Sequence, residues 1–142
     1  MKDPHNLQRF VEAQENVKDA VSRELAEGEK RSHWMWFVFP QVQGLGMSMT
    51  AERYAISSLE EARAYLDHPV LGERLREWTR LVLKVEGKSA KGIFGYPDYL
   101  KFRSSMTLFA QVAEEGSLFE KALEKYYGGE PDTKTLSILG IS

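Results

Sequence analysis

The most aromatic window of this chain reads Arg31-Ser32-His33-Trp34-Met35-Trp36-Phe37-Val38-Phe39-Pro40-Gln41, and it contains two of the three tryptophans. Its apolar run from Trp34 to Phe39 is continuous, so periodicity alone does not separate a buried strand from a buried helical turn. The chain offers no second convincing strand, and a lone strand would leave its backbone N–H and C=O groups unpaired. The sequence therefore favours a short buried helix that ends before Pro40.

Helical patterns surround this window on both sides. Upstream, Asn6 is suited to capping a first short helix, and a second helix is expected from about Asn16 to Gly28. Downstream, the expected helix starts are Thr50, Ser58, Pro69, Ser89, Pro97, Ser117 and Pro131. The helices that begin near Pro69 and Pro97 carry long apolar stripes. We predict an all-α fold of roughly seven to nine helices, two of them long, in one compact domain over residues 1–142.

Charge and hydropathy exclude several classes of function. The chain has 142 residues, with 19 basic and 21 acidic side chains and a net charge of -2. A broad nucleic-acid surface needs a basic excess, so nucleic acid is not an expected partner. The N-terminus lacks the apolar core of a signal peptide, and no apolar run approaches the length of a membrane span. We therefore expect a cytoplasmic protein with no membrane partner, and the absence of cysteine fits a reducing compartment.

Residues for metal binding or nucleophilic catalysis are sparse. No thiolate or cysteine zinc site is possible without cysteine. The histidines His5, His33 and His68 are far apart in sequence, and no H-E-x-x-H or G-x-S-x-G motif occurs. The sequence predicts no metal and no cofactor. If a reaction occurs, His33 is the candidate acid or base, because the reference pKa of histidine, about 6.5, suits neutral pH.

The aromatic window has two interpretations. In the first, Trp34 and Trp36 are core anchors, since large aromatic side chains dominate core energetics. In the second, one indole lines a pocket and stacks on a planar group of a ligand, with His33 at the mouth. Gln41 would then add a polar contact just beyond Pro40.

A second candidate region is the helix expected from Pro97. With about 100° per residue, Ser105 lies about 40° from Lys101 on the apolar side, while Arg103 lies about 200° away. A lysine on this side either extends to solvent, pairs with a buried carboxylate, or points into a cavity that binds an anion. The adjacent hydroxyls of Ser104 and Ser105 would supply donors in such a cavity, or they are small to allow close helix packing.

A group of segments along the chain carries a resemblance to a known family: Leu7-Gln8-Arg9-Phe10, Arg31 to Gln41, Gly44-Leu45-Gly46, Tyr54-Ala55-Ile56, Ala64-Tyr65-Leu66, His68-Pro69-Val70-Leu71-Gly72 and Lys101 to Phe109. Together they resemble a family catalogued as a domain of unknown function, DUF1810. The resemblance covers nearly the whole chain and implies a mainly helical fold, with no established activity, substrate or catalytic residue. Some members carry a calpastatin label, which we do not transfer because calpastatin inhibitory segments are disordered and this chain has a globular pattern.

Two functional hypotheses follow from these residues. The leading one is binding of a small anionic ligand, such as a nucleotide or phosphorylated metabolite. The alternative is a non-catalytic protein-interaction module whose aromatic window is core or a partner-binding patch. The ligand-binding residues of the leading hypothesis are His33, Trp34, Trp36, Gln41, Lys101, Arg103, Ser104 and Ser105.

Overall fold

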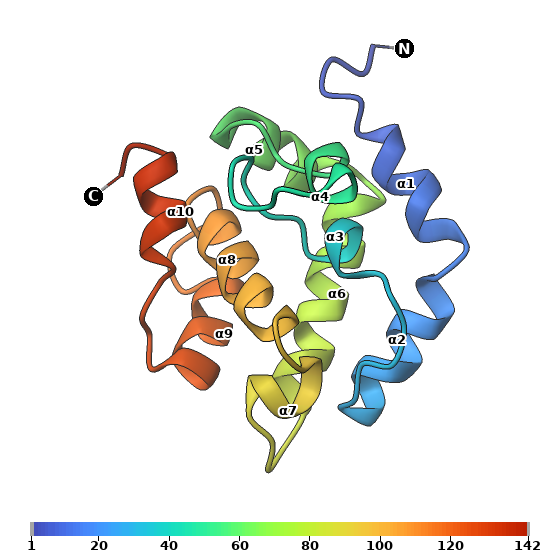
Figure 1. Cartoon of the computed structure of the whole chain (residues 1–142), viewed down its shortest axis with the longest axis vertical. Coiled ribbons are helices and arrows are strands. Elements are labelled where there is room, and N and C mark those ends of the chain that lie inside the picture. The colour runs from blue at the N-terminus through green and yellow to red at the C-terminus, as the bar shows by residue number, and fades with distance from the viewer. Residues whose placement is uncertain (1, 142) are drawn as a thin grey trace.

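The computed structural model describes residues 2–141, and ten helices occur in this range (Figure 1). They are α1 (Gln8–Glu15), α2 (Lys18–Glu27), α3 (Met35–Val38), α4 (Met49–Arg53), α5 (Leu59–Asp67), α6 (Leu71–Lys84), α7 (Ala90–Phe94), α8 (Asp98–Ala110), α9 (Leu118–Tyr127) and α10 (Thr133–Ile138). The predicted all-α class is confirmed, although the count exceeds the predicted range by one. Within the described residues, β-structure is limited to one isolated parallel bridge between Val42 and Ile56.

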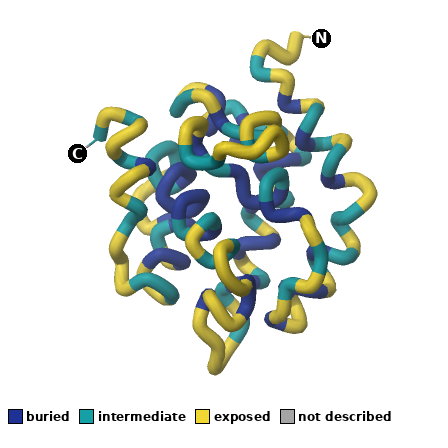
Figure 2. The backbone as a smooth tube through the Cα atoms, viewed as in Figure 1, coloured by how far each residue is buried: buried dark blue, intermediate teal, exposed yellow. Residues whose placement is uncertain are grey.

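The two long helices organise the packing. Helix α8 contacts α5, α7, α9 and α10, while α6 contacts α2, α5 and α9. In Figure 1, α8 lies near the middle of the molecule, with α9 and α10 on one side and α1 and α2 on the other. Figure 2 shows that much of the buried backbone gathers at this centre, whereas the outer helices alternate between exposed and buried positions.

The aromatic window runs through the core as predicted. Trp34 and Phe39 are fully buried, and α3 between them forms the expected short buried helix. The ring of Phe39 meets the Phe102 ring of α8 edge-on, with centroids 5.0 Å apart. It also meets the Phe94 ring of α7 at 5.9 Å. The window thus joins α7 and α8 to the N-terminal half of the chain through aromatic contacts.

Four predicted helix starts are confirmed by side-chain caps. The side chains of Ser58, Ser89 and Ser117 each accept a hydrogen bond from the backbone N–H three residues later. Asp132 caps α10 in the same way. These caps depend on residues close in sequence, so the local pattern is enough to predict them.

Two predicted caps are wrong. Asn6 does not cap α1. It has a positive φ of 50°, and the carboxylate of Asp3 instead accepts hydrogen bonds from Leu7 N and Gln8 N. Thr50 lies inside α4, whose cap is Ser48. In both cases a side-chain oxygen of a residue earlier in the chain, Asp3 or Ser48, accepts the hydrogen bonds of the free N–H groups.

Gly72 allows the chain to turn sharply from α5 into α6. A Cβ atom added at Gly72 would lie 2.0 Å from the carbonyl oxygen of Leu66, which is far inside contact distance. The same carbonyl accepts a hydrogen bond from Arg76 Nη1 at 3.1 Å. A larger side chain at position 72 would therefore separate two helices that pack against each other.

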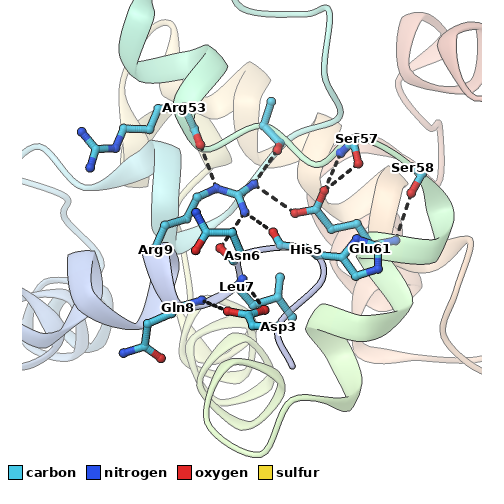
Figure 3. Close-up of polar contacts among 11 residues, drawn as sticks. Asp3, His5, Asn6, Leu7, Gln8, Arg9, Arg53, Ser57, Ser58 and Glu61 are labelled. Carbon is cyan, nitrogen blue, oxygen red and sulfur yellow. Dashed lines mark hydrogen bonds and ion pairs between the residues drawn. The ribbon is translucent and has the colours of Figure 1, made fainter. Parts of the chain in front are cut away.

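Arg9 ties the N-terminal helix to the segment between α4 and α5 (Figure 3). Its guanidinium donates to the carbonyl oxygens of Arg53 at 2.8 Å and Ala55 at 2.9 Å. It also pairs with the carboxylate of Glu61 at 3.0 Å. Glu61 in turn accepts hydrogen bonds from both N and Oγ of Ser57. All three nitrogens of the Arg9 guanidinium donate to oxygens of the protein, which indicates a structural role for this network.

Candidate functional site

The aromatic window and α8 meet at Trp36 and Lys101. Lys101 Nζ lies 5.1 Å from the centroid of the Trp36 ring. The lysine side chain is 27% exposed, and Trp36 is half-buried, so both remain accessible to solvent. An ammonium above an indole face is attracted by the electron-rich ring, typically by about 0.5–1 kcal/mol at exposed sites. Two residues nominated from distant parts of the sequence are therefore neighbours.

Asp98, in the first turn of α8, holds two lysines at this position. Its Oδ2 lies 2.8 Å from Lys30 Nζ, and its Oδ1 lies 3.6 Å from Lys101 Nζ. Two ammonium groups thus share one carboxylate, which leaves one positive charge without a matching anion in this group. We call Lys30, Trp36, Asp98 and Lys101 the lysine–tryptophan cluster.

The two lysines of the cluster differ in how fully they are satisfied. The Lys30 side chain is only 8% exposed, and its ammonium also donates to the carbonyl oxygen of Ser32 at 2.6 Å. The same ammonium lies 5.0 Å from the Trp34 ring centroid. Lys101 has the longer ionic contact and the greater exposure. An incoming anion would therefore meet Lys101 rather than Lys30.

Trp34 is directed away from solvent. It is fully buried, and its Nε1 donates to Oε1 of Glu24 at 3.0 Å. Glu24 also accepts from Arg31 N at 2.8 Å and from Ser32 N at 3.1 Å and Ser32 Oγ at 2.5 Å. Burial alone would raise the pKa of Glu24, but these hydrogen bonds together outweigh it and lower the pKa to about 2. Trp34 and Glu24 therefore anchor the loop between α2 and α3.

Two of the nominated α8 residues face the C-terminal helices. Arg103 Nε donates to the carbonyl oxygen of Glu130 at 3.0 Å, and its guanidinium lies 5.5 Å from the Tyr127 ring centroid. Ser104 Oγ donates to Oδ2 of Asp132 at 2.9 Å, which links α8 to the cap of α10. The structure does not bring these two residues to the lysine–tryptophan cluster.

The remaining nominated residues differ in exposure. His33 is exposed, directly before the buried Trp34. Gln41 is half-buried, and its carbonyl oxygen accepts from Ile56 N at 2.9 Å. Ser105 is fully buried, and its Oγ has no hydrogen-bond partner among the described residues.

Asp98 and Glu24 were not recognised as site or anchor residues from the sequence. Asp98 lies three residues before Lys101, but its second partner, Lys30, is distant in sequence, so no local spacing indicates the shared contact. A signal did exist for Glu24. At about 100° per residue, Glu24 lies within about 20° of Val17 on the apolar face of α2, where an unpaired carboxylate would be costly. A hydrogen-bonding role could therefore have been expected for Glu24.

Two surface hollows lie apart from the cluster. One, between α2 and α6, has a volume of about 350 Å³ and includes Arg74 and Trp78 in its lining. The other, of about 430 Å³, lies beside α10 and is lined in part by Leu136 and Ile141.

Over residues 2–141 no group of three or more metal-ligating side chains is found. Nor does any helix in that range have the length and apolarity to cross a membrane.

The family resemblance seen in the sequence agrees with a comparison against models of protein families. A family model described as a protein of unknown function, DUF1810, matches residues 4–139. The chain belongs to the DUF1810 family. The resemblance seen in the sequence is thereby confirmed.

The fold of this DUF1810 chain is also found in a solved structure. That structure is described as the conserved hypothetical protein Rv1873 from Mycobacterium tuberculosis. The two chains are 55% identical, with a TM-score of 0.96, and the match covers 99% of this chain and 100% of the other. No curated protein matches the DUF1810 chain. The comparisons therefore support the family and the fold.

Proposed function

We propose that this DUF1810 chain binds a small anionic molecule at the lysine–tryptophan cluster. The observation that carries the proposal is the position of Lys101 Nζ, 5.1 Å from the centroid of the half-buried Trp36 ring. Lys101 shares the carboxylate of Asp98 with Lys30, so the cluster has an excess of positive charge. A planar anion would find a ring for stacking and an ammonium for charge pairing in adjacent positions.

The ligand class that fits is a nucleotide or another phosphorylated metabolite with a flat ring. Its phosphate would replace the 3.6 Å contact between Lys101 and Asp98, which is longer than a hydrogen bond and therefore weak. The Lys30–Asp98 contact of 2.8 Å would remain and hold the start of α8 in place. His33 is exposed and precedes Trp36 by three residues in the chain, so we propose it as a further polar partner. We propose Trp36, Lys101 and His33 as the contacting residues, with Asp98 and Lys30 positioning them.

A thermal-shift experiment on the full chain tests the proposal. The probes are AMP, ATP, ribose 5-phosphate and inorganic phosphate, and the variants are Lys101→Ala and Trp36→Phe. A nucleotide at about 100 times its Kd should raise Tm by about 5–10 °C, and both variants should reduce this shift. Lys91→Ala is the matched control, because Lys91 Nζ lies 6.0 Å from the Tyr99 ring centroid outside the cluster.

If no probe shifts Tm, or if the shift survives in Lys101→Ala, then the cluster does not bind these anions. The lysine and the indole would then serve the fold or a protein partner, as in the alternative hypothesis.

A further inference from the structure

His68 lies between α5 and α6, outside the lysine–tryptophan cluster, and its imidazole caps the turn that leads into α6. Its Nδ1 accepts hydrogen bonds from the backbone N–H groups of Val70 at 3.1 Å and Leu71 at 3.2 Å. Its carbonyl oxygen accepts from Gly72 N at 3.0 Å, and its backbone is extended, with a φ of -68° and a ψ of 131°. These are the contacts of an N-cap residue, and Pro69 follows at the position that favours proline.

This cap depends on one protonation state of the imidazole. A backbone N–H group can only donate, so Nδ1 of His68 must present a lone pair, and the ring proton of the neutral form must lie on Nε2. A protonated imidazole carries a proton on both ring nitrogens and has no acceptor left. The hydroxyls of Ser58 and Ser117 cap α5 and α9 without changing charge between pH 5 and 8, whereas histidine titrates in that range.

The carboxylate of Asp3 offers a protonated His68 another partner. Hydrogen bonds from Gln8 N and Leu7 N lower the pKa of the Asp3 carboxyl. The positive charges of His68 and Arg9 lower the pKa of Asp3 further, so Asp3 attracts the charged imidazole. Further charged side chains around this turn come from α2, α5 and α6, and they are Lys18, Asp19, Asp67, Glu73, Arg74 and Arg76.

We infer that His68 makes the start of α6 sensitive to pH. The neutral imidazole caps the turn before α6, and protonation removes the acceptor of the Val70 and Leu71 N–H groups. The imidazolium then pairs with the Asp3 carboxylate, a contact that only the charged form gains. The contribution of the cap is therefore present at about pH 8 and is lost as the pH falls toward about 5. The rest of α6 stays held by its packing on α2, α5 and α9.

Amide hydrogen exchange of the full chain, followed by NMR, tests this inference. In the wild type, the protection factors of the Val70 and Leu71 amides should fall about fivefold between about pH 7.5 and about pH 5. The amide of Glu61 donates to Ser58 Oγ at 3.1 Å and serves as the internal control. Its protection factor should not change over the same range of pH.

Three variants separate the roles of the two side chains. His68→Asn keeps a capping oxygen that does not titrate, so the protection of the Val70 and Leu71 amides should no longer depend on pH. His68→Ala removes the cap, and protection should be low at both pH values. Asp3→Asn keeps an oxygen that can cap α1 but removes the charge, so the loss of protection should move to lower pH.

Equal protection of the Val70 and Leu71 amides at both pH values in the wild type would overturn the inference. So would an equal loss of protection in His68→Asn. An unshifted loss in Asp3→Asn would contradict the pairing with Asp3. Nitrogen-15 NMR of the imidazole at neutral pH gives a separate check, because a proton on Nδ1 in place of Nε2 would contradict the cap. None of these measurements depends on an anion that binds at Lys101.

Discussion

Ser105 is an unusual residue in the core of this protein. Its side chain is fully buried, and its Oγ has no partner among the described residues. Its neighbours on α8 behave differently, because Ser104 Oγ donates to Oδ2 of Asp132 and Thr107 Oγ1 donates to the carbonyl oxygen of Arg103. A buried hydroxyl without a hydrogen bond costs about 1–3 kcal/mol. Ser105 therefore lowers the stability of the helix packing in which it lies.

Replacing Ser105 by alanine should increase stability. The Ser105→Ala variant removes the unpaired hydroxyl, and we expect the free energy of unfolding to rise by about 1 kcal/mol in urea denaturation. Ser104→Ala is the matched control, and it should lose about 1 kcal/mol because it breaks the hydrogen bond to Asp132. A loss of stability in Ser105→Ala would show that this hydroxyl does have a partner in solution.

At the scale of elements, Arg9 fixes α1 against the segment between α4 and α5. The guanidinium donates to backbone carbonyl oxygens and pairs with Glu61, whose side chain is only 4% exposed. A planar group with five donors can make these contacts at once, whereas a lysine ammonium is a single point with three donors.

The Arg9→Lys variant should therefore be less stable. We expect the free energy of unfolding to fall by about 2 kcal/mol, since carbonyl oxygens that Arg9 satisfied would lose their donors. Urea unfolding followed by far-UV circular dichroism measures the change. Arg23→Lys, on the exposed side of α2, is the control and should differ little from the wild type. Equal stability of Arg9→Lys and wild type would contradict a structural role for the network.

Sequence patterns predicted those elements that depend on nearby residues. The capping serines Ser58 and Ser117 were found because the acceptor and its N–H partner are three residues apart. Asp3 was missed because its carboxylate reaches past the expected cap residue. The proximity of Trp36 and Lys101 was hypothesised from the unusual position of a lysine on an apolar face. The sharing of Asp98 with Lys30 depends on how distant segments pack, and no local spacing reports it.

At the scale of the whole molecule, acid stability depends strongly on Glu24. Its pKa is about 2 in the folded protein, against a reference value of 4.5. Because the folded-state pKa is lowered, the ionised carboxylate stabilises the fold above pH 4.5, and this contribution is lost as the pH falls toward 2. The difference corresponds to about 3 kcal/mol. Acid should therefore weaken the anchoring of the loop between α2 and α3 progressively as the pH falls from 4.5 toward 2.

The Glu24→Gln variant tests this pH dependence. At pH 7 we expect it to lose about 3 kcal/mol of unfolding free energy, and the gap to wild type should close as the pH approaches 2. Glu27→Gln is the control, because Glu27 is exposed on the same helix and, within residues 2–141, its one ion pair is with exposed Arg31. Its effect should stay below about 1 kcal/mol. A pH-independent difference between Glu24→Gln and wild type would contradict the lowered pKa.

The unequal burial of the three indoles has an optical consequence. Trp34 and Trp78 are almost completely shielded, whereas Trp36 is half-buried beside Lys101. A neutral collisional quencher such as acrylamide should therefore dim mainly the emission of Trp36. The protein carries an intrinsic fluorophore at the place where a ligand is proposed to dock, and occupancy there can be followed without any added label.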